Sequence, residues 1–308
     1  MFFFRKDFIS LKDISAEEIL YILDTAETMK QVLNQKNKKT PYLQGKSVIL
    51  LFYEDSSRTR LSYQLASQYL SASIVDMTIP QHIDDIGGLV NMGKMIDQMG
   101  ADFIVMRHPM AGSADFLAEN ISSSVINAGD GLNENPSQAL LDLMTIKNEK
   151  GSFKGLKVAV VGDIAYSRSS HSNILGLVKL GAEVSIAAPP TLIPDKIDSF
   201  GVKVHYDVYE AVRDADVIIV LRMTNDKAYG TLLPSYNEYS HFFKIDSTVL
   251  RAAKPDVIVM HPPGTVKRGI EISSEVLESP KCFFNDQISN GIAVRMALLY
   301  LLSIKGGK

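Results

Sequence analysis

The amino-acid sequence predicts an α/β fold built from two doubly wound domains, each a mainly parallel sheet flanked by helices. Short apolar runs of strand length alternate with amphipathic segments along almost the whole chain, which is typical of repeated strand–helix units. The length of 308 residues is sufficient for two domains with ordinary hydrophobic cores. A polar stretch with two glycines at 148–155 separates two series of apolar runs, so the domain boundary is expected there.

The first domain, expected at 1–150, contains four predicted strands. Runs rich in β-branched and other apolar residues lie at 47–53, 73–77, 102–106 and 124–127, and their length favours buried strands. After the first run, apolar residues recur three and four positions apart, at Leu61, Leu65, Ala66 and Tyr69. That spacing predicts a helix that follows the strand directly.

The second domain, expected at 151–290, contains five further runs of the same kind. They lie near 157–162, 183–187, 203–206, 217–221 and 257–260. A last apolar helix is expected within 291–308, after a loop rich in Asn, Asp and Ser. We expect this helix to pack back on the first domain.

Composition excludes several classes of protein. The chain is 46% hydrophobic and 22% charged, which excludes disordered and fibrous proteins. The net charge of −3 provides no broad basic surface, so nucleic acid is not an expected partner and any anion site must be local. The apolar residues 1–4 end at Arg5, too soon for a signal peptide, and no apolar stretch approaches a membrane span. A cytoplasmic protein without membrane contact is expected.

Cysteine and histidine usage gives no support for a disulfide, a metal or another cofactor. Cys282 is the single cysteine, which excludes an intramolecular disulfide. His108, His171 and His261 do not have the spacing of a metal site. No serine, nor Cys282, lies beside a histidine in a recognisable nucleophile motif, so covalent catalysis has no support either.

The run from Ser56 to Arg60, Ser-Ser-Arg-Thr-Arg, lies where the first predicted strand passes into its helix. Unpaired backbone N–H groups, the positive end of the helix dipole, hydroxyls and a guanidinium meet at such a junction, and together they suit a phosphate group. The alternative is a serine N-cap beside two solvated arginines. The run by itself leaves both interpretations open.

Other polar residues follow the remaining strands, at the sheet edge where open α/β folds bind ligands. They lie in the segments 107–109, 127–131, 135–138, 162–168, 222–225 and 261–264. Arginine recurs among them at Arg107, Arg168 and Arg222, and Arg58 of the first run makes a fourth. One such arginine is usually a surface residue, but four with hydroxyls and amides predict a cleft for a substrate with several negative charges.

Each motif also has a structural interpretation. Gly162 and Asp163 follow a strand, but the G-x-G-x-x-G pattern is absent, so nucleotide binding is disfavoured. Asp163 is more readily explained as a loop cap. His261, before two prolines, could serve only to orient a rigid turn, and His108 before Pro109 has the same two interpretations.

The ordered set of motifs resembles the aspartate and ornithine carbamoyltransferase family. The motifs lie at 52–60, 106–109, 127–131, 136–143, 161–172, 221–222, 260–262, 268–272 and 290–295, so the resemblance covers nearly the whole chain. The aspartate branch is much the closer. The ornithine branch would show a cysteine-containing motif at the site that reads His-Pro-Pro-Gly at 261–264.

The resemblance implies transfer of the carbamoyl group of carbamoyl phosphate to an amine, without a cofactor. The first domain would bind carbamoyl phosphate. Its phosphate would be held by Ser56, Ser57, Arg58 and Thr59, its carbonyl oxygen by Thr59 and Arg107, and its amide by Gln138 and the backbone near Pro136. Asn135 stands where the family has a histidine and can still donate a hydrogen bond to a carbonyl oxygen, and Glu54 matches the acid that orients an arginine. The expected catalytic set is Arg58, Thr59, Arg107, Asn135 and Gln138.

The second domain would bind the acceptor. Arg168 and Arg222 match the arginines for the two carboxylates of aspartate, and the backbone at Pro262 and Pro263 would fix the reacting groups. The resemblance further implies a homotrimer with active sites shared between subunits and a place in pyrimidine biosynthesis. A regulatory chain or a pathway partner stays open.

Three positions depart from the family pattern. A loop lysine that reaches the neighbouring subunit's site is replaced by Asp84 or Asp85, depending on the register. Asn135 stands where the family has a histidine, and it is a neutral donor with a different reach. Thr224 stands where a glutamine is expected. Three hypotheses therefore remain: transfer to aspartate, a different acceptor or donor, and a non-catalytic relative that binds a ligand or partner enzyme.

Overall fold

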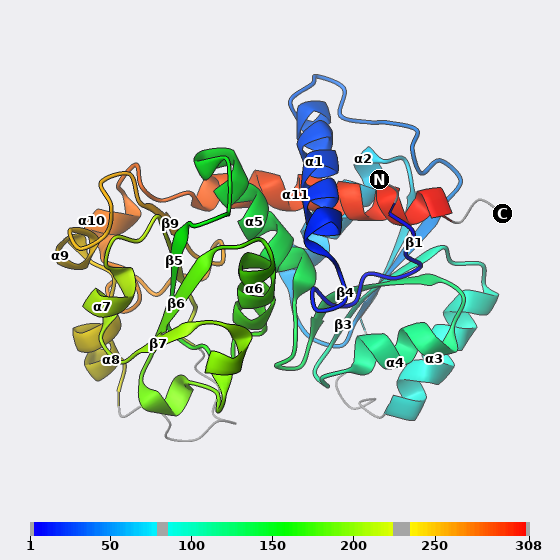
Figure 1. The fold of residues 1–308 in the computed structure, drawn as a ribbon. Helices are drawn as coiled ribbons and strands as arrows, with labels where there is room; N and C mark the ends of the chain where they lie inside the picture. Colours follow the sequence, from blue (N-terminus) through cyan, green and yellow to red (C-terminus); the bar gives the residue numbers. More distant parts are fainter. Residues whose placement is uncertain (1–2, 79–85, 224–234, 306–308) are drawn as a thin grey trace. The chain divides into compact units, whose positions relative to one another are not determined.

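The computed structural model describes residues 3–78, 86–223 and 235–305 (Figure 1). The chain divides into two compact units: the first comprises Met1–Met144 and Ser289–Lys308, and the second comprises Thr145–Ile288. Each unit contains one sheet in which every strand pair is parallel, flanked by helices. The predicted α/β class is confirmed.

The first unit is built on a four-stranded sheet with the order β2-β1-β3-β4. The strands are β1 (Ser47–Phe52), β2 (Ser73–Thr78), β3 (Phe103–His108) and β4 (Ser124–Asp130). The helices are α1 (Ala16–Leu33), α2 (Ser57–Tyr69), α3 (Ile86–Gln98) and α4 (Ser113–Asn120), with the beginning of α5 (Pro136–Lys150) and most of α11 (Phe284–Lys305).

Both faces of the central strand β1 are buried, which explains why it reads as a continuous apolar run. Alternate residues of β1 point to opposite faces. Ile49 and Leu51 join a core cluster with residues of α3 and α4, such as Leu89 and Leu117. Leu50 on the other face is also fully buried, so helices or loops cover both sides.

The second unit is built on a five-stranded sheet with the order β7-β6-β5-β8-β9. The strands are β5 (Lys157–Val161), β6 (Glu183–Ala187), β7 (Lys203–His205), β8 (Val217–Val220) and β9 (Ile258–Met260). The helices are α6 (Arg168–Lys179), α7 (Val208–Val212), α8 (Tyr236–Phe243), α9 (Ser247–Leu250) and α10 (Ser274–Leu277), with short 3-10 turns η1 (Pro190–Leu192) and η2 (Ile197–Phe200).

Two sequence-based expectations need correction. β3 and β4 are longer than expected, so His108 and Asp130 end the strands rather than follow them, and the two residues pair across a register shift. The expectation that no apolar stretch approaches a membrane span was wrong on length and composition, because α11 satisfies both over Phe284–Ile304 with a mean hydropathy of 1.3. Since 67% of this apolar stretch is buried inside the protein, α11 has the burial of a core helix.

The loop before β4 is held by Asp97 at the end of α3. Its carboxylate accepts hydrogen bonds from the backbone N–H groups of Ser122 at 3.2 Å and Ser123 at 2.7 Å, and from the Ser123 hydroxyl at 2.5 Å. Partial burial alone would raise the pKa of Asp97, but these hydrogen bonds outweigh it and hold the pKa below its ordinary value. The charged form of Asp97 therefore stabilises the folded protein.

Replacing Asp97 by asparagine is expected to lower the free energy of unfolding at neutral pH by about 1–3 kcal/mol, because the Ser122 and Ser123 donors then face a neutral amide in place of a charged carboxylate. The folded pKa lies below the unfolded value, so the contribution is complete above the unfolded pKa and is lost as pH falls through the folded pKa. Urea unfolding at about pH 7 and at about pH 3 should show the difference between wild type and variant shrinking in acid. Asp115→Asn, an exposed carboxylate of the same unit, is the control, and a difference independent of pH would contradict the assignment.

Candidate active site

The β1–α2 junction has the geometry expected of an anion site. Ser56 is the N-cap of α2, yet its side chain makes no capping hydrogen bond, and the first helical bond runs from the Arg60 N–H to the Ser56 carbonyl at 3.0 Å. Ser57, Arg58 and Thr59 therefore form the first turn, whose N–H groups precede the helical hydrogen-bond ladder. This arrangement favours the phosphate interpretation over a simple serine cap.

The two arginines of this run have different surroundings. Arg60 forms an ion pair with Asp76 on β2 at 2.8 Å, and its guanidinium lies 5.0 Å from the centroid of the Phe52 ring. It therefore contributes to the packing of α2 on the sheet. Arg58 lies exposed in the first helical turn, which makes it the arginine placed to reach a ligand.

Arg107 lies beside this junction because β1 and β3 are neighbours, with Phe52 opposite Arg107. Its Nε atom lies 3.1 Å from Oε2 of Glu54, and Nη1 donates to the Ala128 carbonyl at 3.2 Å. The Arg107 side chain is only 14% exposed. Glu54 and the backbone of β4 thus hold the guanidinium at the carboxyl edge of the sheet, close to the start of α2.

The loop between β4 and α5 is fixed by buried polar contacts. Asn127 Nδ2 donates to Asp130 Oδ1 at 2.7 Å, and the Gly112 N–H donates to Asp130 Oδ2 at 2.7 Å. Gly131 has a φ of +51°, and a Cβ atom there would lie 2.6 Å from the backbone nitrogen of Ala111. This position requires glycine, because a side chain would collide with the backbone that follows β3.

His108 is part of this support. It is fully buried, its Nδ1 accepts a hydrogen bond from the Met110 N–H at 3.1 Å, and its ring lies 4.6 Å from the Tyr53 ring. Of its two interpretations, the geometry favours orientation of the turn.

The start of α5 carries Asn135 and Gln138. Asn135 is buried, its carbonyl accepts the Gln138 N–H at 3.0 Å, and its side-chain oxygen lies 3.4 Å from the Ser137 hydroxyl, which donates to it. Gln138 donates from Nε2 to Asp142 Oδ1 at 3.2 Å. The amide of Gln138 is thus oriented by a buried carboxylate one turn further along the helix.

Behind the start of α2 lies Arg295 of α11, to which the sequence analysis assigned no role. Its Nη1 donates to the Ser62 hydroxyl and to the Gly291 carbonyl, both at 2.9 Å, and its guanidinium lies 5.1 Å from the Tyr63 ring centroid. Burial lowers the pKa of Arg295, while Tyr63 and Asp142 oppose that shift, and burial raises the pKa of Tyr63. An arginine in an otherwise apolar helix was the signal available in the sequence.

In the second unit, Arg168 begins α6 at the carboxyl edge of the sheet. The Ser167 side chain caps this helix by accepting the Ser170 N–H. Asp163 is buried and accepts the Tyr166 N–H at 3.1 Å, which supports its interpretation as a loop cap. Arg168 is therefore carried by a short, well-anchored loop after β5.

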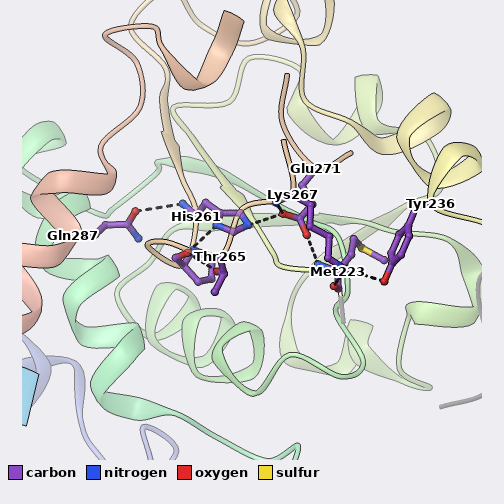
Figure 2. A network of polar contacts seen from close by, with 8 residues as sticks. Met223, Tyr236, His261, Thr265, Lys267, Glu271 and Gln287 are labelled. Atoms are coloured by element: carbon purple, nitrogen blue, oxygen red, sulfur yellow. Dashed lines mark hydrogen bonds and ion pairs between the residues drawn. The ribbon is translucent and has the colours of Figure 1, made fainter. Parts of the chain in front are cut away.

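Arg222 and the His261–Pro263 segment lie after β8 and β9, which are neighbours in the same sheet. Arg222 is exposed, whereas His261 is buried and its Nε2 lies 3.0 Å from Oε2 of Glu271 (Figure 2). The Pro262 carbonyl accepts the Thr265 hydroxyl at 2.7 Å and lies 2.9 Å from His261 Nδ1. His261 therefore does more than precede a turn, because it also belongs to a buried polar network.

The predicted residues thus gather at one sheet edge in each unit. Ser56–Thr59 and the start of α5 follow strands of the first sheet, whereas Arg107, expected to follow a strand, lies inside β3 next to its end. Arg168, Arg222, Pro262 and Pro263 follow strands of the second sheet. Thr224, Asp84 and Asp85 lie outside the described residues. Within the described ranges, no group of three or more His, Cys, Asp or Glu residues is arranged to hold a metal ion.

The structure is that of a two-unit α/β protein, with arginines at the carboxyl edge of the parallel sheet in each unit. The family profile described as aspartate/ornithine carbamoyltransferase, carbamoyl-P binding domain, matches residues 6–148. The profile described as the Asp/Orn binding domain of the same family matches residues 154–302. The chain belongs to the aspartate/ornithine carbamoyltransferase family.

Individual relatives agree with this assignment. The aspartate carbamoyltransferase catalytic subunit of Acetivibrio thermocellus is 55% identical over 97% of this chain and 96% of that protein. The crystal structure of aspartate transcarbamoylase from Trypanosoma cruzi, in complex with aspartate and phosphate, is 28% identical with a TM-score of 0.81 and covers 96% of this chain and 95% of its own. The structure of ornithine carbamoyltransferase from Pyrococcus furiosus is 28% identical with a TM-score of 0.83, and the match covers 98% of this chain and 97% of that chain.

Proposed function

We propose that this protein transfers the carbamoyl group of carbamoyl phosphate to the amine of aspartate. The observation that carries the proposal is the Arg107 guanidinium, held by Glu54 beside the first turn of α2. This places a fixed cation next to an anion-binding helix N-terminus, as a phosphorylated carbonyl compound requires. The 55% identity to an aspartate carbamoyltransferase catalytic subunit supports the same reaction.

In this reaction the amine nitrogen attacks the carbamoyl carbon and the carbon–oxygen bond to phosphate breaks. Phosphate leaves with the bonding electrons and takes up the proton that the amine loses. Ser56, Ser57, Arg58 and Thr59 bind the phosphate, and Thr59 and Arg107 donate to the carbonyl oxygen as it gains negative charge. Such donors accelerate the step because they stabilise charge that develops in the transition state. No protein nucleophile is needed when the two substrates are held in line.

The carbamoyl amide is bound by Gln138, which Asp142 orients at 3.2 Å, and by the backbone near Pro136. Asn135 donates to the carbonyl oxygen as a neutral amide where the family resemblance implies histidine. Arg168 and Arg222 bind the two carboxylates of the acceptor, Thr224 is assigned to the acceptor from its position in the sequence two residues after Arg222, and the backbone at Pro262 and Pro263 fixes the reacting groups. In this proposal residues 1–150 bind carbamoyl phosphate and residues 151–290 bind the acceptor.

The proposal extends to assembly and place in the cell. The family resemblance supports a cytoplasmic homotrimer that acts in pyrimidine biosynthesis, with active sites completed by the neighbouring subunit. Sedimentation of the purified chain tests the assembly directly: a trimer mass is expected, and a monomer mass at all concentrations would overturn this part of the proposal.

Purified protein given carbamoyl phosphate and aspartate is expected to release phosphate and form carbamoyl aspartate in equal amounts. The matched control omits aspartate, since carbamoyl phosphate itself decomposes slowly. Absence of product at high enzyme concentration would overturn transfer to aspartate, and turnover with another amine in a panel would then identify a different acceptor. If no amine reacts but carbamoyl phosphate still raises the melting temperature, the protein is a non-catalytic binder, because a ligand of the folded state stabilises it.

A further inference from the structure

Lys267 lies beside the proposed acceptor arginine Arg222, although neither the motifs nor the family resemblance assigned it a role. Its Nζ atom donates to the Met223 carbonyl and to the Tyr236 hydroxyl, both at 2.8 Å (Figure 2). The ammonium also lies 4.1 Å from the centroid of the Tyr236 ring. The side chain is therefore fixed at its charged end rather than extended into solvent.

The Met223 N–H is held from the other side. It donates to Oε1 of Glu271 at 2.7 Å, while Oε2 of the same carboxylate accepts the Lys267 N–H at 2.6 Å and lies 3.0 Å from His261 Nε2. Glu271 is completely buried. Both backbone polar groups of Met223 are thus bound by one continuous network that includes Lys267, Glu271 and His261.

The chain is fixed on both sides of Arg222. Upstream, the Leu221 N–H donates to the Val161 carbonyl at 2.8 Å, which extends the β8 pairing. Downstream, Met223 is buried and anchored as described. Arg222 between them is exposed, so the backbone that carries it is fixed while its guanidinium is directed outward.

We propose that Lys267 is a positioning residue that holds the Met223 carbonyl and so places the Arg222 guanidinium for the acceptor carboxylate. This inference rests on the proposed function. A preorganised arginine binds a carboxylate more tightly because less conformational freedom is lost on binding. Lys267 itself does not touch the substrate, so it acts on acceptor affinity and not on the chemical step.

Lys267→Met is expected to raise KM for aspartate about tenfold while KM for carbamoyl phosphate and kcat stay within about twofold, because binding of one substrate is weakened. Lys267→Arg retains a cation and donors and should restore most of the affinity. The matched control is Lys203→Met, since Lys203 pairs with Glu183 at 3.6 Å on the exposed edge of the same unit. An unchanged KM for aspartate, or an equal loss for both substrates, would overturn the proposal.

Hydrogen exchange without any ligand separates this inference from the proposed function. The amide of Met223 should exchange at least about tenfold faster in Lys267→Met than in wild type or in Lys203→Met, because the segment loses one of its anchors. Glu271→Gln should also accelerate exchange of the Met223 amide. A glutamine side chain has one oxygen acceptor, whereas the N–H groups of Met223 and Lys267 each use one oxygen of Glu271. Inactivity of the wild type toward aspartate would refute only the proposed function, whereas unchanged exchange in Lys267→Met would refute the anchoring.

Discussion

Replacing Arg107 by alanine is expected to lower kcat for carbamoyl transfer by about 10²- to 10³-fold, the usual cost of removing one donor to a developing oxyanion. Its guanidinium is held by Glu54 at 3.1 Å and by the Ala128 carbonyl at 3.2 Å, so it meets the substrate without prior rearrangement. Steady-state kinetics with carbamoyl phosphate and aspartate provides the measurement, and kcat should fall more than KM rises.

The control for this variant is Arg5→Ala. Arg5 also forms an arginine–glutamate pair in the first unit, with Nε 2.7 Å from Oε1 of Glu18, but it lies before α1 and outside the proposed site. Its loss should leave kcat unchanged. If Arg107→Ala raised KM for carbamoyl phosphate and left kcat intact, Arg107 would bind the ground state only and its role in stabilising the transition state would be wrong.

Much of the fold was predictable because the burial of a parallel strand on both faces leaves a direct mark on the sequence. Runs such as 47–53 and 157–162 contain almost only apolar residues and became β1 and β5. The predicted positions of the other strands agree within a few residues. Strand ends were less well predicted, since His108 and Asp130 are polar yet belong to β3 and β4. Their pairing depends on buried hydrogen bonds that the apolar pattern does not record.

Residues of the candidate site could be predicted only where a polar or charged residue stands at a predicted strand end. Arg58 follows β1 and Arg107 lies next to the carboxyl end of β3, so the rule for ligand sites in open sheets identified them. Arg60 belongs to the same run, but its ion pair with Asp76 depends on the β1–β2 pairing. Lys267 lies in a loop after β9, and its importance follows from contacts with Met223 and Tyr236 that are far away in the sequence.

Arg295 is the strongest case of a residue whose role depends on tertiary structure. It is 4% exposed on α11, and its partners Ser62 and Tyr63 come from α2. Asp142 on α5 is also buried, and its negative charge favours the charged form of Arg295. The Asp142 carboxylate also accepts a hydrogen bond from Gln138. A buried cation therefore connects the helix of the proposed phosphate site to the residue that orients the proposed amide binder.

Replacing Arg295 by methionine is expected to lower the free energy of unfolding by about 1–3 kcal/mol, because the Ser62 hydroxyl and the Gly291 carbonyl lose their donor and the buried Asp142 carboxylate loses a favourable positive charge. Urea unfolding at neutral pH provides the measurement. The double variant Arg295→Met with Asp142→Asn should recover part of this loss, since it removes both charges and the two sites are coupled. Additive losses in the double variant, or a loss below about 1 kcal/mol in Arg295→Met, would contradict the coupling. Partial recovery would establish that α11 contributes a charge, and not only apolar surface, to the core behind the proposed phosphate site.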